Sequence, residues 1–383
     1  MILLVFLAYY GINCFINIYF MFGPLYETFG ASPAQVGLFL SIFYMTMTVC
    51  RPLGSLFMER VGIKKALLGS SLLSAVTASG IAVSLALSMP RLLLLFRALS
   101  GVSASVFIVA TIAYQSMILD EKNRGVGFAL FTTGSMLPLA TVVPLAEWLL
   151  NNEHSYAYMW LPTVVAAVCF VISLRMKETH SVTRREKAWG TYANLFKIKG
   201  VPTLYFSAVL MSVADSMTLC VAMLAVDRGV AVSYFMIAVS VAAVCIRTLG
   251  FKLMDRIPRL LLAAPAAALI SLSVFFMSFS STPSLFVIFG ALFGLGIGMG
   301  YPTHLCIIGD IVPIELHPKA TGGFLLFYDF GWIITPLLFG VLSPLFGASG
   351  AFRVIGFAAF ACAAAIQYFM WIPLWREHRS AAA

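Results

Sequence analysis

Residues 51–60 read RPLGSLFMER, and residues 247–256 read RTLGFKLMDR. The two stretches align at an offset of 196 residues, and they share arginine, leucine and glycine near their starts. Methionine, an acidic residue and a second arginine are shared at their ends. A second echo joins FRALSG at 96–101 to FGALFG at 289–294. Self-similarity of this kind indicates a duplicated unit, so we expect two related halves.

The composition around these repeats is typical of a membrane protein. Of the 383 residues, 61% are hydrophobic and only 10% are charged. A soluble domain is roughly 45–50% apolar and roughly 25% charged, so the balance excludes a soluble enzyme, a disordered chain and a disulfide-rich secreted domain. All seven cysteines fall in apolar segments without a Cys-x-x-Cys pair. We therefore expect small buried residues there, and neither a disulfide framework nor a zinc site.

Uncharged runs divide the chain into segments that are long enough to cross a membrane, which takes about 20 apolar residues in a helix. Two crossings share the run 260–309, which is broken near Ser280–Pro283, and two weaker spans, 201–224 and 232–254, each contain one charge. The other runs are 1–26, 28–50, 66–90, 98–119, 125–146, 155–174, 330–352 and 354–375. None alternates in the way that barrel strands do. We predict an all-α integral membrane protein with twelve transmembrane helices.

The basic residues indicate the orientation of these spans. If the amino terminus is cytoplasmic, eighteen Lys and Arg residues lie at cytoplasmic ends, and only Arg91, Arg228 and Arg353 lie outside. This bias follows the positive-inside rule, and an even number of spans then places both termini in the cytoplasm. The longest cytoplasmic loop, 175–200, links a six-helix half at 1–174 to a second at 201–383. We expect a multi-pass protein of a bacterial plasma (inner) membrane, surrounded by lipid, with no nucleic-acid partner.

The stretch from residue 51 to residue 65, RPLGSLFMERVGIKK, resembles a motif of the major facilitator superfamily. The family places this motif between helices 2 and 3, usually as Gly-x-Leu-x-Asp-Arg-x-Gly-Arg-Lys. Ser55 stands where the glycine usually is, with Gly54 one residue early, and Glu59 replaces the aspartate. The resemblance extends over essentially the whole chain. It implies a fold of two six-helix pseudo-repeats, in the drug or metabolite efflux-like branch.

Two further matches support this resemblance, and a third is weaker. Arg97-x-x-x-Gly101 is similar to the family's helix-4 motif, and Arg124-Gly125 is similar to the opening of helix 5. The helix-5 motif of antiporters normally ends in Gly-Pro…Gly-Gly, whereas residues 143–147 read VPLAE. This departure supports uptake as the alternative to export.

By resemblance, the loop motif locks a cytoplasmic gate, with Glu59 bonding across the two halves. We interpret Arg51 and its repeat counterpart Arg247 as gate or helix-end residues more than substrate ligands. The expected gating set is Arg51, Gly54, Glu59, Arg60, Gly62, Lys64, Arg124, Arg247, Asp255 and Arg256.

Ionisable residues inside the spans are the main candidates for chemistry, because a charge at bilayer depth is costly and persists where it faces a cavity or a partner. Arg97 can bind an anionic group or pair with an acid during proton coupling, or it can snorkel or form a fixed ion pair. Asp215, near the middle of helix 7, can take up a proton or bind a cation. The alternative is a packing acid held by Ser212 or Ser216.

Asp329 and His304 are further candidates for proton coupling. Asp329 can instead pair with Arg247, and a lone histidine is more often a packing residue with satisfied hydrogen bonds. In the resembled family, helices 1, 4, 7 and 10 line the cavity, so we expect polar side chains there to contact substrate or to pack between helices. These cavity candidates are Asn13, Asn17, Tyr114, Gln115 and Tyr301.

We therefore predict a secondary active transporter that moves a small organic solute by alternating access, coupled to protons and directed outward. Three intramembrane arginines against two aspartates leave room for an anionic or zwitterionic substrate, such as a metallophore or an organic acid. The alternatives are proton symport or facilitated uptake, and a non-transporting receptor. No clustered catalytic motif or phosphate-binding loop occurs, and we interpret the glycine run at 290–300 as close helix packing. We expect no enzyme activity, no cofactor, no metal and a monomer.

Overall fold

The computed structural model describes the chain except for residues 1, 119–132, 178–191, 250–256, 314–315 and 383. All regular secondary structure in the described residues is helical. The chain forms two compact units, Met1–Arg185 and Glu186–Ala383. Their boundary falls within the loop 175–200.

The described helices account for twelve membrane crossings. Ten segments are long and apolar enough to span a bilayer. The longest, Lys319–Glu377, contains two helices because Gly347 breaks it with a φ of 72°. A shorter apolar helix, Ser233–Leu249, supplies the remaining crossing. The predicted all-α integral membrane fold is confirmed.

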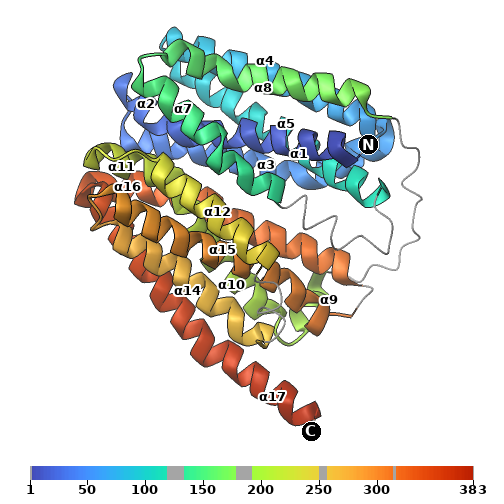
Figure 1. Ribbon diagram of the computed structural model, residues 1–383. Helices are drawn as coiled ribbons and strands as arrows, with labels where there is room; N and C mark the ends of the chain where they lie inside the picture. Colours follow the sequence, from blue (N-terminus) through green and yellow to red (C-terminus); the bar gives the residue numbers. More distant parts are fainter. Residues whose placement is uncertain (1, 119–132, 178–191, 250–256, 314–315, 383) are drawn as a thin grey trace. The chain divides into compact units, whose positions relative to one another are not determined.

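The first unit is a layered bundle in which neighbouring helices pack along their length (Figure 1). Helix α4 packs on α5 and α8, α5 packs on α3, and α1 packs on both α5 and α8. Its elements are α1 (Ile2–Ile18), η1 (Tyr19–Met21), α2 (Phe22–Thr28), α3 (Pro33–Val61), α4 (Ile63–Ala86), α5 (Pro90–Ile118), α7 (Val142–Asn151) and α8 (Ser155–Arg175).

Local chemistry explains where α3 begins and ends. At its start, the backbone N–H of Ser32 donates to Gln35 Oε1 (2.8 Å), and the backbone N–H of Gln35 donates to Ser32 Oγ (3.3 Å), which is a capping box. At its end, Gly62 turns the chain into α4 with a φ of 91°. Only glycine adopts this conformation without strain, which accounts for Gly62 in the loop motif.

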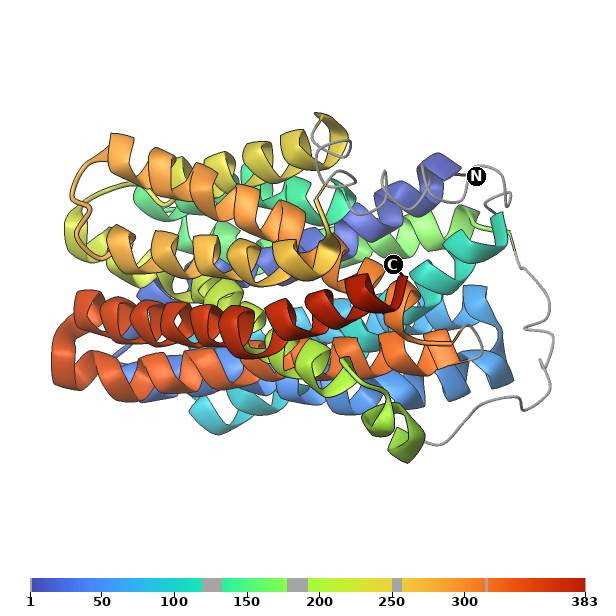
Figure 2. The same ribbon diagram turned by 90° about the horizontal axis from the view of Figure 1, so that it is seen from below.

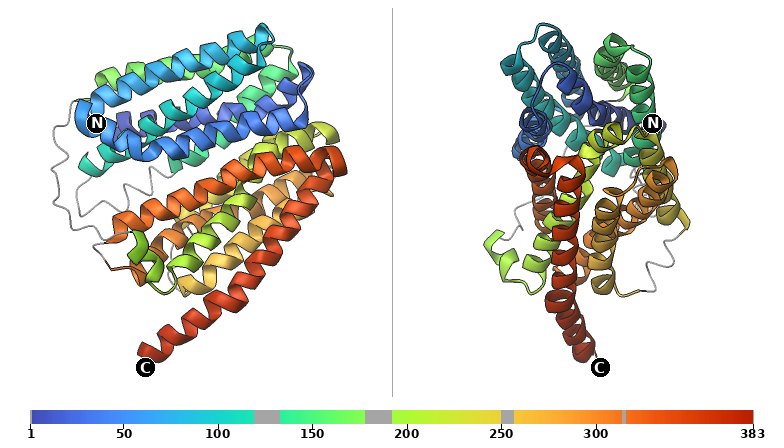
Figure 3. Two further views of the ribbon diagram at one scale, coloured as in Figure 1. Left: turned by 180° about the vertical axis from the view of Figure 1, so that it is seen from behind. Right: turned by 90° about the vertical axis from the view of Figure 1, so that its left-hand side faces the viewer.

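In the second unit, α12 packs on α15, α15 on α14, and α10 on α16. Figure 2 and Figure 3 show the two legs of α16 folding back at the kink, and α17 continuing from the second leg. The elements are α9 (Tyr192–Lys197), α10 (Val201–Asp215), η3 (Ser216–Cys220), α11 (Val221–Arg228), α12 (Ser233–Leu249), α14 (Arg259–Met277), α15 (Pro283–Ile311), α16 (His317–Ile366), η5 (Gln367–Trp371) and α17 (Ile372–Ala382).

The first crossing of each unit is interrupted at an equivalent position. Tyr19 opens the 3₁₀ segment η1 after α1, and Asp215 immediately precedes the 3₁₀ segment η3 after α10. These two residues lie 196 residues apart, which is the offset of the sequence repeat. Tightened turns within a helix often mark a functional hinge, so both breaks draw attention to the side chains around them.

The glycines of α15 confirm the packing interpretation of the glycine run. A Cβ atom on Gly290 or Gly294 would press against backbone atoms of α12, and one on Gly296 against α14. Small residues allow such close approach between membrane helices.

Two helices extend beyond the charge-free runs that marked them. Helix α5 starts at Pro90, so it includes Arg91 and Arg97 before the run 98–119. The first leg of α16 starts at His317, before the run 330–352. Charge-free runs underestimate helices whose first turns carry ionisable residues. The expected burial of cysteines holds for Cys14, Cys169 and Cys220, but Cys245 and Cys306 are exposed on helix surfaces.

Candidate functional site: a caged arginine and a tyrosine-bound aspartate

Arg97 lies in the interior of the first unit, 1% exposed, inside a box of aromatic rings. Its guanidinium carbon is 4.2 Å from the ring centroids of Tyr19 and Phe43, and 4.9 Å from that of Phe39. Tyr19 comes from the η1 break and the two phenylalanines come from α3. Each face contact is a cation–π interaction, which stabilises a desolvated cation by about 2 kcal/mol or more.

The rings leave the charge of Arg97 without a balancing acid. Among the described residues, no carboxylate lies within 4.0 Å of its guanidinium. Its Nε and Nη1 atoms are buried without a hydrogen-bond partner. Because burying an unpaired ion costs several kcal/mol, this arginine is poised for an anionic partner.

Close packing between α3 and α5 holds the box together. Thr46 on α3 donates from Oγ1 to the carbonyl oxygen of Ala98 on α5 (2.8 Å). Gly101, one turn after Arg97, lies against the Phe43 carbonyl and Thr46, where a Cβ atom would collide with both. The Arg-x-x-x-Gly pattern thus has a physical basis, because the glycine allows α5, which carries the arginine, to pack closely against α3.

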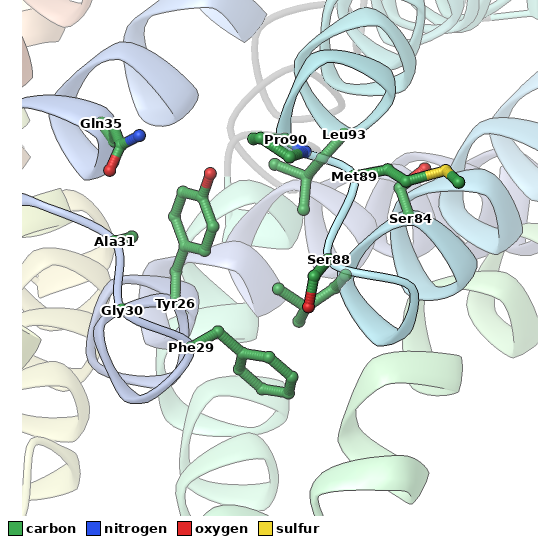
Figure 4. Close-up of a pocket in the computed structure, with 11 residues that line it drawn as sticks. Tyr26, Phe29, Gly30, Ala31, Gln35, Ser84, Ser88, Met89, Pro90 and Leu93 are labelled. Atoms are coloured by element: carbon green, nitrogen blue, oxygen red, sulfur yellow. The ribbon is translucent and has the colours of Figure 1, made fainter.

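A pocket of about 210 Å³ opens beside the box, at the end of the unit where α2 meets the turn between α4 and α5. Figure 4 shows Tyr26 and Phe29 projecting into this pocket opposite Pro90 and Leu93. Phe39 contacts Tyr26 at a ring distance of 5.9 Å and also contacts the Arg97 guanidinium. The Phe39 ring therefore lies between the pocket and the buried cation.

In the second unit, a carboxylate occupies the helix break. Asp215 is 8% exposed, and its Oδ2 atom accepts a hydrogen bond from the Tyr328 hydroxyl on α16 at 2.6 Å. Neither Ser212 nor Ser216 binds this carboxylate, because their hydroxyls donate to backbone carbonyls. Arg247 on α12 acts electrostatically on Asp215 and on Tyr328.

Packing between α10 and α16 brings Asp215 and Tyr328 together. Ser216 donates to the carbonyl oxygen of Gly331 (3.1 Å), and Thr335 donates to that of Val213 (3.1 Å). Gly331 lies so close to Ser212 and Val213 that a Cβ atom would collide with both. This glycine sits one turn from Tyr328, as Gly101 sits one turn from Arg97.

The aromatic surroundings of Asp215 include one cavity candidate and one proton candidate from the sequence. Tyr301 packs edge-on against Tyr328 at 5.2 Å and against Phe324 at 5.6 Å. His304 is completely buried, with Nδ1 2.8 Å from the Gly300 carbonyl oxygen and Nε2 2.8 Å from Ser207 Oγ. The carbonyl can only accept, so Nδ1 carries a proton, and both ring nitrogens are occupied. This geometry favours a packing role for His304.

The other sequence candidates are dispersed. Asp329 is 4% exposed on α16, beside Tyr328 in sequence. Asn13 donates to the Tyr9 carbonyl of its own helix (2.8 Å), and Asn17 is buried near the η1 break. Tyr114 donates to the carbonyl oxygen of Lys177 (3.0 Å), and neighbouring Gln115 buries an unpaired amide nitrogen. These last two lie about five turns along α5 from Arg97, so within the first unit they lie at a different level of this helix.

Only part of the expected gate lies in the described structure. Arg51 is half-buried on α3, Arg247 ends α12 and Lys64 lies in the first turn of α4. Helix α3 includes Gly54, Glu59 and Arg60, but the structure describes only their backbone. The residues that lie wholly outside the described part are Arg124, Asp255 and Arg256. The gate therefore stays a prediction.

Sequence reasoning missed the residues that complete both clusters. The walls of the Arg97 box, Tyr19, Phe39 and Phe43, look like ordinary apolar positions in the sequence. The repeat offset does contain a signal, because it maps Tyr19 onto Asp215. Glu147 was also missed: it is 5% exposed inside the span Thr133–Asn151, beyond the charge-free run that predicted this helix. Within the described residues, no group of three His, Cys, Asp or Glu side chains is placed to hold a metal ion.

Solved structures with the same fold are transporters. A D-xylose–proton symporter superposes with a TM-score of 0.78 at 12% identity, over 96% of this chain and 97% of the other. A POT family transporter in complex with 5-aminolevulinic acid gives 0.76 at 13% identity, over 96% and 95%. The nucleoside transporter NupG gives 0.74 at 13%, over 98% of both chains. At such identities, the likeness establishes the fold alone.

The family is established by sequence. The family model of the Major Facilitator Superfamily matches residues 1–303 and 253–382, which together span almost the whole chain. No curated protein is significantly similar to the chain in sequence. The chain belongs to the Major Facilitator Superfamily and is a secondary transporter of that family, not an enzyme.

Proposed function

We propose that this transporter carries a small organic solute with an anionic group, either an organic acid or a zwitterion, in exchange for protons. The observation that carries the proposal is Arg97, a buried cation with two unpaired nitrogen atoms and no carboxylate within 4.0 Å in the described structure. A substrate carboxylate or phosphate would supply the missing counter-charge and accept the unused N–H donors. The rings of the box then have to part for substrate to enter.

Asp215 supplies the proton-coupling group in this proposal. Unlike an arginine, an aspartate changes its charge when it binds a proton. The Tyr328 hydroxyl donates to one oxygen of this carboxylate, Oδ2, at 2.6 Å. Asp329 remains a second candidate for this role, because it is buried beside the same tyrosine.

Outward transport is the direction that the helix-2 and helix-4 motifs favour. Inward transport by proton symport or facilitated diffusion is the alternative, and the departure of residues 143–147 from the antiporter motif supports it. The fold neighbours include a protein described as a D-xylose–proton symporter, so the same scaffold serves proton symport elsewhere. We place the protein in the bacterial inner membrane with cytoplasmic termini, where a proton gradient is available.

The test is substrate-dependent proton flux in proteoliposomes that contain the full chain, an imposed pH gradient and a pH-sensitive dye. The panel contains organic acids, zwitterionic chelators and cationic drugs. Dissipation of the gradient by an organic acid or a zwitterion supports the proposal, and the sign of the flux separates antiport from symport. A response to cationic drugs alone, lost in Asp215→Asn but intact in Arg97→Gln, would overturn the anionic-substrate proposal.

A further inference from the structure

Two arginines of the second unit converge on one serine, Ser278. Arg228, the last residue of α11, donates from Nη2 to the Ser278 carbonyl oxygen (3.0 Å) and to Ser349 Oγ (2.8 Å). Arg353, on the second leg of α16, donates from Nε to Ser278 Oγ (3.3 Å). Ser278 is the residue after α14, so the ends of three elements meet at these two guanidinium groups.

This pair of positive charges has no acidic partner. Within the part of the chain that the structure describes, no carboxylate lies within 4.0 Å of either guanidinium, and this includes the exposed Asp227 beside Arg228. Two cations that share one serine repel each other, and an arginine cannot lose its charge. An anion bound between them would remove the repulsion.

The two side chains are held in place but keep most of their hydrogen-bonding capacity. A guanidinium has five N–H donors in a fixed fork that matches phosphate and carboxylate oxygens. Within the described residues, Arg228 and Arg353 make three side-chain hydrogen bonds, which leaves seven of their ten N–H donors for a ligand. The Arg353 guanidinium also lies 4.4 Å from the centroid of the Phe279 ring, which fixes its plane.

The surroundings place these charges at the edge of the membrane. Phe279 is 53% exposed and lies two residues beyond the span Arg259–Met277. Leu345 and Phe346, at the kink of α16, are 69% and 60% exposed. Exposed apolar side chains beside cationic groups are typical of the level where lipid headgroups begin. By the charge distribution of the sequence, this end of the unit faces away from the cytoplasm.

We propose that Arg228 and Arg353 form a binding site for a phosphate-type oxyanion at the non-cytoplasmic end of the second unit. The oxyanion is either the headgroup of an anionic phospholipid or free phosphate. Both present tetrahedral oxygens to the two guanidinium forks, with Ser278 as the common anchor. The site shares no residue with the Arg97 and Asp215 clusters, and it does not depend on the proposed substrate.

The experiment measures binding of two probes to the purified full chain in detergent. Native mass spectrometry counts bound phosphatidylglycerol, and a thermal-shift titration measures the response to inorganic phosphate. The variants are Arg353→Gln, which loses a single long hydrogen bond to Ser278, and Arg228→Lys, which keeps the charge without the fork. The matched control is Arg91→Gln, because Arg91 is the third arginine expected at the non-cytoplasmic side and is exposed in the first turn of α5.

We expect wild type and Arg91→Gln to bind one of the two probes, with about tenfold weaker binding for Arg353→Gln and for Arg228→Lys. If phosphatidylglycerol stays bound when inorganic phosphate is added, the site binds a lipid. If phosphate displaces the phosphatidylglycerol, the site binds the free anion. The inference is overturned if wild type binds neither probe, or if both variants bind like Arg91→Gln. A melting temperature measured without probe shows whether Arg353→Gln is folded. If Arg353→Gln does not fold, Arg353→Lys is measured in its place.

Discussion

The two units hold opposite charges beside corresponding helix breaks. In the first, Tyr19 opens the helix break and stacks on the Arg97 guanidinium, 4.2 Å away. In the second, Asp215 stands at the break and accepts a hydrogen bond from Tyr328. Arginine is always charged, whereas a buried aspartate can be neutral or charged. The duplicated scaffold thus carries a permanent charge on one side and a switchable charge on the other.

The units use the same packing device to position these groups. Gly101 lets α5 approach α3, which supplies two walls of the arginine box, and Gly331 lets α16 approach α10, which brings Tyr328 to Asp215. In both cases the glycine lies one turn from the functional side chain. In both units, close helix packing determines the position of the functional side chain. The identity of that side chain then determines the chemistry of the unit.

The permanent charge gives the largest expected effect. Arg97→Gln keeps a polar side chain but removes the cation, and we expect affinity for an anionic substrate to fall about 100-fold, because losing one partner of a buried charge pair costs about 2–5 kcal/mol. Binding of labelled substrate to purified protein measures this loss. Arg91→Gln is the control, and equal affinities for the two variants would remove Arg97 from substrate binding.

The close helix contact at Gly331 predicts the next largest effect. Gly331→Val would force α16 away from Ser212 and Val213, so we expect transport to fall about tenfold or more at equal expression, together with a lower melting temperature. Gly322 lies on the same helix with open space around it, so Gly322→Val is the matched control. Wild-type transport by Gly331→Val would show that the close contact does not position Tyr328.

The hydroxyl that holds Asp215 can be removed alone. Tyr328→Phe keeps the ring packing against Tyr301 and Phe324 but loses the hydrogen bond, which to a charged group contributes about 1.5–3 kcal/mol. We expect the number of protons moved per substrate to fall severalfold. The ratio of proton flux to labelled-substrate flux measures this number. Tyr368→Phe, at an exposed position, serves as control. An unchanged flux ratio in Tyr328→Phe would show that Tyr328 has no role in proton coupling.

The smallest effect is expected at His304. Its ring nitrogens already contact Gly300 and Ser207, so His304→Gln should lower stability by about 1–3 kcal/mol and leave the coupling ratio within about twofold of wild type. Thermal unfolding and the flux ratio are measured on the same preparation. Loss of coupling with normal stability would return His304 to the proton pathway.

The sequence predicts the fold well because apolar run length, basic-residue bias and the 196-residue repeat all reflect the bilayer directly. It also selects Arg97 and Asp215, since an ionisable residue within an apolar run stands out. It does not reveal Tyr19, Phe39 and Phe43, because aromatic residues are as common facing lipid as facing a cation. It does not reveal the carbonyl partners of Asn13 and Tyr114, because helix membership alone does not say which backbone group a side chain binds.

The central claim is that Asp215 carries the proton, and one paired measurement tests it. Proteoliposomes with Asp215→Asn are assayed for exchange of labelled against unlabelled substrate without a pH gradient, and for substrate-dependent proton flux with one. Asp310→Asn, which alters an exposed acid paired with Arg259, is the control. We predict that Asp215→Asn retains exchange and loses proton flux, whereas Asp310→Asn retains both. Proton flux at the wild-type ratio in Asp215→Asn would contradict this division of roles between the two units.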